Sequence, residues 1–305
     1  MSGAPINTGN FGKALWPGVN SWYGKAYDEI PEQYTDLFDI HTSSRAFEED
    51  VGVTSFGLLA KKNEGGPIQY DSERQAFVTR YAWTEYALGF VITKNMYEDD
   101  QYMIVGEKRA KGLAFSTRQT IETIAANVYN RAFTSTYAGG DSKELLATDH
   151  PNFAGGTWAN EPSTAADISE AALEQACIDI ARWTNDRGLK ITVIPQSIHV
   201  APEQEFELHR ILKTDGRVGT NNNDLNALKS MGKFPKGVKI NHYFTDTDAW
   251  FIRTNVTDGL KWWWRRRPDF SQDNDWETEN AKYKVVFRAG SGWTDPKALY
   301  GSPGA

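Results

Sequence analysis

The most constraining feature of this sequence is a long stretch, residues 95–135, that carries the marks of a single helix. Asn95 stands three residues before Glu98, the spacing of a capping box, and two aspartates follow where the positive end of a helix favours carboxylates. From Asn95 onward, no proline occurs before Pro151. One apolar stripe recurs at helical spacing, formed by Ile121, Ile124, Ala125, Val128 and Ala132. The sequence therefore predicts a helix over this stretch.

Such a helix has consequences for the shape of the molecule. If residues 96–134 form one helix, it is about 58 Å long, at about 1.5 Å per residue. A compact globule of 305 residues has a radius of gyration near 19 Å, hence a diameter of roughly 50 Å. We therefore expect a flat or elongated plate whose faces need partners. The alternative is a break at Gly106 or Gly112.

Charge, cysteine content and hydropathy exclude several classes of protein. With 33 Lys and Arg against 40 Asp and Glu, the net charge is −7, which argues against a nucleic-acid-binding surface over the whole chain. The single cysteine, Cys177, excludes a disulfide scaffold and a cysteine-rich zinc module, and fits synthesis in a reducing cytosol. The longest apolar uncharged stretch, residues 191–202, is too short to span a bilayer. Residues 1–24 lack the compact apolar core of a secretory signal.

The first 40 residues have no secondary-structure period. Glycines and prolines punctuate single aromatic residues, among them Trp16 and Trp22. Because disordered tails are usually poor in aromatic residues, the pattern predicts an extended arm that lies on its own body or on a neighbour. A loosely packed terminus is the alternative.

A second arm is predicted from a hairpin pattern. Residues 51–60 have strand composition, and the turn cluster at residues 63–67 reverses the chain into Ile68 and Tyr70. A further β-rich run, residues 77–91, leads back to the body.

The remainder alternates helices and strands and then becomes strand-rich. A helix is predicted over residues 168–186 with Gly188 as its C-cap, then a buried strand over 191–200 and a helix from Pro202 to Thr214. This alternation predicts an α/β second domain. Strands are predicted over residues 238–244, 250–253, 259–267 and 283–288, before a Gly- and Pro-rich end.

No catalytic, cofactor or metal site is predicted. The five histidines show no HExxH spacing, and Glu205 with His209 is best interpreted as a solvated pair on a helix surface. Residues 18–25 resemble a phosphate loop but have one residue too many and lack the following Ser or Thr. Cys177 lies within a helical apolar pattern and is interpreted as a core residue.

The segment Lys261–Arg267 carries three tryptophans and then Arg265, Arg266 and Arg267, with acidic residues that include Asp273 and Asp275 soon after. Basic and aromatic residues together could clamp single-stranded nucleic acid, with Trp262 to Arg267 as the binding segment. A long antiparallel hairpin is favoured, in which the basic and acidic blocks pair with each other or with neighbouring subunits. Aromatic residues beside many carboxylates also allow a carbohydrate-active enzyme, although no pair of acids stands out.

The order of these parts along the chain, together with three stretches of sequence, resembles that of a known protein family. The stretches are Gly89–Asp100, which leads into the long helix; Leu189–Pro195 with Val200–Pro202; and Thr245–Phe251. From about residue 45 onward the chain resembles the HK97-like major capsid proteins of tailed bacteriophages. The ending, Tyr300–Ala305, is similar to that of the Mu-like head-subunit group.

The resemblance implies an α+β, HK97-like capsid fold with a defined division. Residues 1–43 would form the N-terminal arm, 44–82 the E-loop, 83–164 the peripheral domain with a spine helix over 95–135, and 165–253 the axial domain. Residues 254–305 would return strands to the peripheral domain and form the C-terminus.

The resemblance also implies a non-enzymatic structural protein without a cofactor. The chain would form hexamers and pentamers of an icosahedral head in the virion, assembled in the bacterial host cytoplasm. Its partners would be other copies of itself, a separate scaffolding protein because the arm begins at Met1, the portal, a decoration protein, and packaged double-stranded DNA held weakly. Expected inter-subunit residues are Trp16, Trp22, Lys61, Lys62, Asn63, Gly65, Gly66, Arg265, Arg266, Arg267, Asp273 and Asp275. Lys61 and Lys62 lie where some relatives carry a cross-linking lysine, but no partner Asn is matched, so assembly is expected to be non-covalent.

Overall fold

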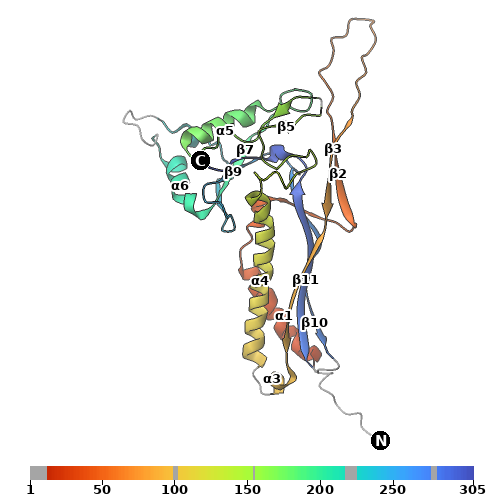
Figure 1. Cartoon of the computed structure of the whole chain (residues 1–305), viewed down its shortest axis with the longest axis vertical. Coiled ribbons are helices and arrows are strands. Elements are labelled where there is room, and N and C mark those ends of the chain that lie inside the picture. Colours follow the sequence, from red (N-terminus) through yellow and green to blue (C-terminus); the bar gives the residue numbers. More distant parts are fainter. Residues whose placement is uncertain (1–11, 99–101, 154, 217–224, 276–279) are drawn as a thin grey trace.

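The computed structural model describes residues 12–98, 102–153, 155–216, 225–275 and 280–305. The body is elongated, with a long helix running along a four-stranded sheet (Figure 1). A second sheet with its own helices lies at one end of this body, and a long loop projects from the same end (Figure 1). The shape agrees with the elongated plate expected from helix length. Among the described residues, no helix is both long and apolar enough to cross a membrane.

The long helix is α4, Tyr102–Asn130, with 29 residues and a length of about 44 Å. It runs through Gly106 and Gly112 without interruption, so a break at either glycine is wrong. Before it, the short helix α3, Lys94–Glu98, already contains Asn95, and the Met96 N–H donates to the Thr93 hydroxyl at 3.5 Å. The predicted cap at Asn95 is therefore displaced to Thr93. The predicted helix, which extended to residue 135, is too long at its C-terminal end, because α4 ends at Asn130.

The first sheet supports α4. Its order is β1-β10-β11-β4, with β1 parallel to β10 and the other pairs antiparallel. The face toward α4 holds Trp262, Trp264, Val285 and Phe287, all buried. Two register shifts flank Arg266, and Pro268, which has no N–H to donate, lies within the second. The strands are β1 (Asp39–Thr42), β10 (Leu260–Asn274), β11 (Ala281–Trp293) and β4 (Thr84–Ile92).

The N-terminal region corrects a prediction. Residues expected to be extended form the helix α1, Gly12–Glu29, which packs on α4 and is followed by the short helix α2, Tyr34–Leu37. Val19, Tyr23 and Ala26 are buried at helical spacing, i, i+4 and i+7. This apolar stripe outweighs the glycines and Pro17, which suggested an arm without secondary structure. Residues 1–11 of the predicted arm lie outside the described residues.

The second sheet has the order β12-β9-β7-β8. The strand β7, Pro195–Val200, lies between β9 and β8, and Pro202 opens a 3-10 turn that runs into α6, as predicted. Gly188 is not a helix cap: α5 ends at Arg182, and Gly188 lies in a later turn at φ 76°. The Gly- and Pro-rich end contains the strand β12, which the sequence did not predict. The elements are α5 (Glu170–Arg182), η2 (Pro202–Gln204), α6 (Glu205–Lys213), α7 (Ala227–Met231), β8 (Val238–Ile240), β9 (Trp250–Thr254) and β12 (Leu299–Ser302).

The predicted hairpin arm is present but its strands are displaced. β2, Phe47–Val53, pairs antiparallel with β3, Gln75–Ala82, and β3 continues into β4 after one residue. Residues 54–74 form no strand and make up the projecting loop (Figure 1). A small strand pair, β5 (His150–Pro151) and β6 (Thr157–Trp158), and the 3-10 turn η3 (Pro296–Ala298) complete the elements.

Candidate assembly surfaces

The projecting loop carries large apolar side chains that its own chain leaves exposed. Leu58 is 83% exposed and Leu59 is 99% exposed. Exposed fractions above one half are also found at Phe56, Ile68 and Tyr70. Contiguous exposed apolar side chains of this kind mark contact surfaces. The loop is therefore a surface that a partner can cover.

The far end of this loop is a tight turn, as predicted. The Gly66 N–H donates to the Asn63 carbonyl at 3.0 Å, and Gly65 adopts φ 74°, a conformation that favours glycine. Lys61, Lys62 and Asn63 are exposed beside the turn. The structure brings these five residues together, and their part in subunit contact stays a prediction.

The base of the hairpin is fixed to the body by a buried polar chain. The Lys261 ammonium on β10 lies 2.5 Å from an Asp50 carboxylate oxygen on β2, and the Thr294 hydroxyl donates to the same carboxylate at 2.7 Å. Tyr81 on β3 shares a hydrogen bond of 2.6 Å with Thr294, and burial raises the pKa of the Tyr81 phenol. These contacts hold both strands of the hairpin at a set place on the first sheet.

The strand β4 is an edge of the first sheet and is a second candidate surface. Leu88 and Val91 on this strand are 53% and 41% exposed, and Phe115 on the neighbouring helix α4 is 55% exposed. Arg109 of α4 donates to the Val91 carbonyl at 2.6 Å, which places helix and strand side by side. An edge strand flanked by exposed apolar residues is suited to contact with another chain.

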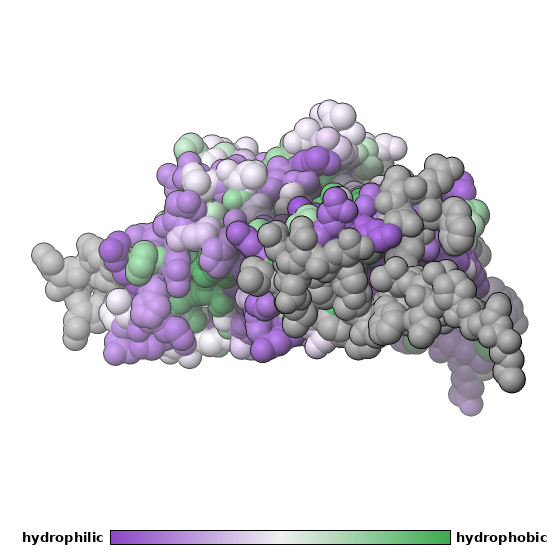
Figure 2. Space-filling view, turned by 90° about the horizontal axis from the view of Figure 1, so that it is seen from below, coloured by the Kyte–Doolittle hydropathy of each residue, from purple (hydrophilic) through white to green (hydrophobic). Residues whose placement is uncertain are grey.

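Figure 2 shows the molecule from below, with mostly hydrophilic residues on the described surface and a recessed hydrophobic area at the left of the view. The three most exposed large apolar side chains among the described residues, Leu59, Tyr70 and Leu58, all lie on the loop. Phe206, Leu225 and Met231, near the second sheet, are also well exposed.

The predicted basic–aromatic segment is a strand of the core. Trp262 is fully buried and Trp264 is 2% exposed, so neither can stack on a base. The expected long antiparallel hairpin is confirmed by the pairing of β10 with β11.

The charged residues of this hairpin have partners on other strands. Arg266 pairs with Glu85 of β4 at 2.9 Å, and Asp275 pairs with Lys282 at 2.7 Å. Asp273 lies opposite Lys282 in the ladder. These ion pairs differ from the predicted pairing of the arginine block with the acidic block, because the register places Lys282 of β11 opposite Asp273. Arg265 is half-buried and Arg267 is exposed, with its guanidinium 6.0 Å from the centre of the Trp264 ring.

The two tryptophans predicted for the N-terminal arm lie on α1. Trp22 is half-buried and packs on the core cluster between α1, α4 and the first sheet. This helix therefore rests on its own subunit. The side chain of Trp16 lies outside the described residues.

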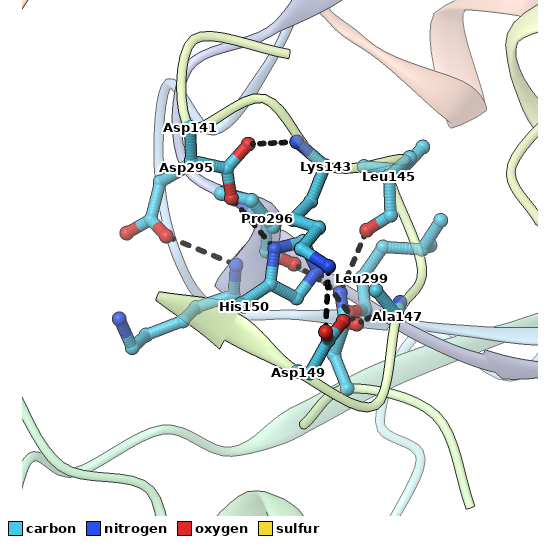
Figure 3. A network of polar contacts seen from close by, with 11 residues as sticks. Asp141, Lys143, Leu145, Ala147, Asp149, His150, Asp295, Pro296 and Leu299 are labelled. Atoms are coloured by element: carbon cyan, nitrogen blue, oxygen red, sulfur yellow. Dashed lines mark hydrogen bonds and ion pairs between the residues drawn. The ribbon is translucent and has the colours of Figure 1, made fainter. Parts of the chain in front are cut away.

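The structure also has a buried network that sequence reasoning missed (Figure 3). The Asn160 amide nitrogen donates to the carbonyls of Leu145, Pro296 and Leu299 at 2.8, 3.1 and 3.2 Å. Its oxygen lies 3.1 Å from His150 Nε2, and His150 Nδ1 lies 2.7 Å from Asp141. The network ties the loop before α5 to the chain that enters β12. The sequence around Asp141, His150 and Asn160 predicts only a loop, because these residue types are common in turns and their spacing matches no known motif.

The cysteine and the loop-like motif considered as possible reactive sites both lie in ordinary structural positions. Burial raises the pKa of the Cys177 thiol to about 11, which keeps it protonated, as expected of a core cysteine. Residues 18–25, the rejected phosphate loop, lie within α1. Within the described ranges, no cluster of three or more His, Cys, Asp or Glu could hold a metal ion.

Comparison with known proteins identifies the architecture. A family model described as "Phage capsid protein" matches residues 76–302. A virus-like particle protein from Pyrococcus furiosus has a similar fold, with 10% identity, a TM-score of 0.57, and 94% of this chain and 99% of that chain covered. The capsid of a native GTA particle gives 10% identity and a TM-score of 0.55, covering 89% of this chain and 90% of that chain.

The procapsid of bacteriophage JBD30 gives 13% identity and a TM-score of 0.51, covering 96% of this chain and 75% of that chain. No curated protein sequence matches the chain. At these identities the solved structures establish the fold alone, which is HK97-like, as expected.

Proposed function

The chain belongs to the phage capsid protein family, and from this premise we propose that its hexamers and pentamers build the head of a tailed phage. It is a major capsid protein, and its copies form an icosahedral shell. Its role is structural, and we assign it no catalytic activity. The Mu-like subgroup suggested by the C-terminal residues stays a prediction.

The observation that carries the hexamer and pentamer assignment is the projecting loop. Burying one leucine of this kind contributes roughly 1.5–3 kcal/mol relative to leaving it exposed. Leu58 and Leu59 gain this energy only when a neighbouring subunit covers them, because they are 83% and 99% exposed on their own chain. In a closed shell every subunit makes the same contact, so modest energies add over many copies.

We propose the division of the chain that the resemblance implied. Residues 1–43 form the N-terminal arm, 44–82 the E-loop, 83–164 the peripheral domain with its spine helix and 165–253 the axial domain. Residues 254–305 return strands to the peripheral domain through β10 and β11 and end the chain with β12, which pairs with β9 of the second sheet. One hydrophobic cluster lies between the second sheet and its helices α5 and α6, which supports an axial domain with a core of its own. Another cluster joins the two sheets, since it holds Trp262 of β10 together with Phe251 of β9.

The partners follow from the role. We propose self-assembly in the cytoplasm of a bacterial host, with a scaffolding protein, a portal and a decoration protein as partners. Packaged double-stranded DNA would be held weakly, because the net charge of each subunit is −7.

Excision of the projecting loop tests the proposal. The Thr54 N–H donates to the Arg74 carbonyl at 2.9 Å, so the two ends of the loop are adjacent. Deleting residues 55–73 and joining the ends through Asn-Gly keeps the β2–β3 hairpin, because Asn-Gly forms two-residue hairpin turns. We expect the full chain, assembled with and without a candidate scaffolding protein, to give closed shells by electron microscopy and sedimentation in at least one of the two conditions. The excised chain should stay a folded small species.

Two controls make the result specific. Circular dichroism of the excised chain should match that of the full chain, which separates lost assembly from lost folding. A full-length chain with Leu58→Ser and Leu59→Ser should lose most of its shell yield. Unchanged shell yield in both variants would contradict the proposed role of the loop.

A further inference from the structure

The projecting loop contacts the second half of its own subunit. Contact between subunits does not by itself require this intrasubunit contact. Asp71 on the returning side of the loop meets Arg187 from the turn after α5. The Arg187 Nη1 atom lies 3.1 and 2.9 Å from the two carboxylate oxygens of Asp71. The Nη2 atom donates to the Ser72 carbonyl at 2.7 Å. One guanidinium therefore binds both a side chain and the backbone of the loop.

Asp71 also joins the two sides of the loop. The Gly57 N–H donates to one carboxylate oxygen at 2.9 Å, and the Ser72 N–H donates to the other at 2.8 Å. These backbone donors and the Arg187 guanidinium favour the carboxylate form, so the pKa of Asp71 lies below its ordinary value. The carboxylate closes the loop near its base and binds it to a second element at the same point.

Arg187 is itself held in place. Its own N–H and that of Leu189 donate to the Asn185 side-chain oxygen at 3.0 and 2.8 Å. The turn is closed by a bridge between Thr184 and Lys190, with Gly188 at φ 76°. An arginine that binds a carboxylate through one nitrogen and a backbone carbonyl through the other fixes direction as well as distance, because its guanidinium is planar and rigid.

We propose that Arg187 and Asp71 form an intrasubunit latch that sets the direction in which the projecting loop leaves its own subunit. Below the latch, the Thr54–Arg74 pair and the Asp50–Lys261 ion pair hold the loop to the body. Beyond the latch, residues 58–70 carry the exposed apolar side chains with no such brace. The latch therefore aims the apolar part of the loop before another copy covers it.

Distance measurements between spin labels test the latch in the full-length chain. One label is placed at Lys62→Cys beside the turn of the loop, and the other at Ala171→Cys on α5, both exposed positions. The native Cys177 is buried and stays unlabelled. Dilution with unlabelled chain confines the measured distances to one subunit. We expect one narrow distance distribution in the parent and a distribution at least twice as wide in Arg187→Ala.

Further variants separate the latch from general effects. Arg182→Ala removes an exposed arginine at the end of α5 and should leave the distribution narrow. Asp71→Asn should widen it as Arg187→Ala does, since the ion pair is lost in both. A distribution that is equally narrow in the parent, Arg187→Ala and Asp71→Asn would overturn the latch. Shell formation is scored separately, so loss of the latch with retained shells leaves the capsid function intact.

Discussion

Glu122 shows how a single buried residue can make the stability of this fold depend on pH. It lies in α4 with no exposed surface, and its carboxylate accepts the Gln33 N–H at 3.0 Å at the entry to α2. Burial is the largest influence and raises its pKa from 4.5 to about 7, against the lowering effect of the Gln33 and Tyr34 backbone donors and of Arg118. The carboxyl therefore binds its proton more tightly in the folded chain than in the unfolded chain.

The sign of the pH dependence follows. A raised folded-state pKa stabilises the fold fully below the unfolded value of 4.5, and this contribution is lost as the pH rises through about 7. The loss amounts to about 3 kcal/mol at most, at about 1.4 kcal/mol per pKa unit. Glu122→Gln keeps an acceptor for Gln33 and cannot ionise. We expect it to gain stability relative to the parent between pH 5 and pH 8, measured by urea unfolding of dilute subunits.

Glu107→Gln is the matched control for this substitution, because Glu107 lies on the same helix, is partly exposed and pairs with Lys111 at 2.7 Å. Its stability difference from the parent should change little over the same pH range. If the difference between Glu122→Gln and the parent is the same at pH 5 and pH 8, the carboxyl does not titrate with a raised pKa.

Gly65 is the residue on which the turn of the projecting loop depends most, because it adopts a positive φ angle. At φ 74° a β-branched side chain is strained by roughly 1–3 kcal/mol, whereas asparagine tolerates the left-handed region. We expect Gly65→Val to distort the turn and lower the yield of shells several-fold, with Gly65→Asn close to the parent. Gly66→Val should have a smaller effect, since only the Asn63 carbonyl, 3.2 Å from the added Cβ, must move. Sedimentation of assembled particles measures the yields, and equal yields for the Val and Asn variants at Gly65 would contradict a role for the turn.

At the scale of elements, the periodicity of apolar residues predicted those helices whose sequence pattern is clear without tertiary contacts. The long helix could be predicted because its apolar stripe is sustained and its two glycines are tolerated at a cost of about 1 kcal/mol each. The helix α1 could not, since Pro17 and Gly18 conceal a stripe that includes Val19, Tyr23 and Ala26. Its stability comes from packing on α4, which is visible only in the folded chain.

The strands show the same limit. The β10–β11 hairpin was predicted from composition, but its ion pairs were not, because the two register shifts around Arg266 decide which charges meet. The end strand β12 was missed because Gly301 lies within it and Pro303 and Gly304 follow it directly. It forms because β9 offers an edge and Leu299 and Tyr300 are buried there.

The candidate surfaces divide in the same way. The turn of the projecting loop was predicted at Asn63–Gly66, since turn chemistry is local. The latch joins Asp71 and Arg187, which are 116 positions apart in sequence, and the buried network joins Asn160 to Leu299, 139 positions away. Such contacts depend on the relative placement of elements, which a single sequence does not show.

At the scale of the whole molecule, the net charge predicts how strongly the shell binds the DNA inside it. A subunit with a charge of −7 repels DNA on average, so contact must come from local basic residues. Arg265 and Arg267 on β10 are candidates, since Arg266 is paired with Glu85. Because Trp262 and Trp264 are buried, neither ring can add base stacking to phosphate contact. We therefore expect binding to duplex DNA to be weaker than about 10⁻⁵ M at physiological salt, within the range typical of non-specific contact.

Fluorescence anisotropy with a labelled duplex, measured over a series of salt concentrations, tests this expectation. A few phosphate contacts give a shallow dependence of affinity on salt, at a slope of about −0.9 per contact. Arg265→Glu with Arg267→Glu should abolish the remaining binding, and the matched pair Lys61→Glu with Lys62→Glu, on the projecting loop, should leave it unchanged. Tight binding with a slope of many contacts would contradict the electrostatic argument and favour a nucleic-acid-binding role for this strand. Weak binding fits a container, because DNA that is held loosely can leave the shell.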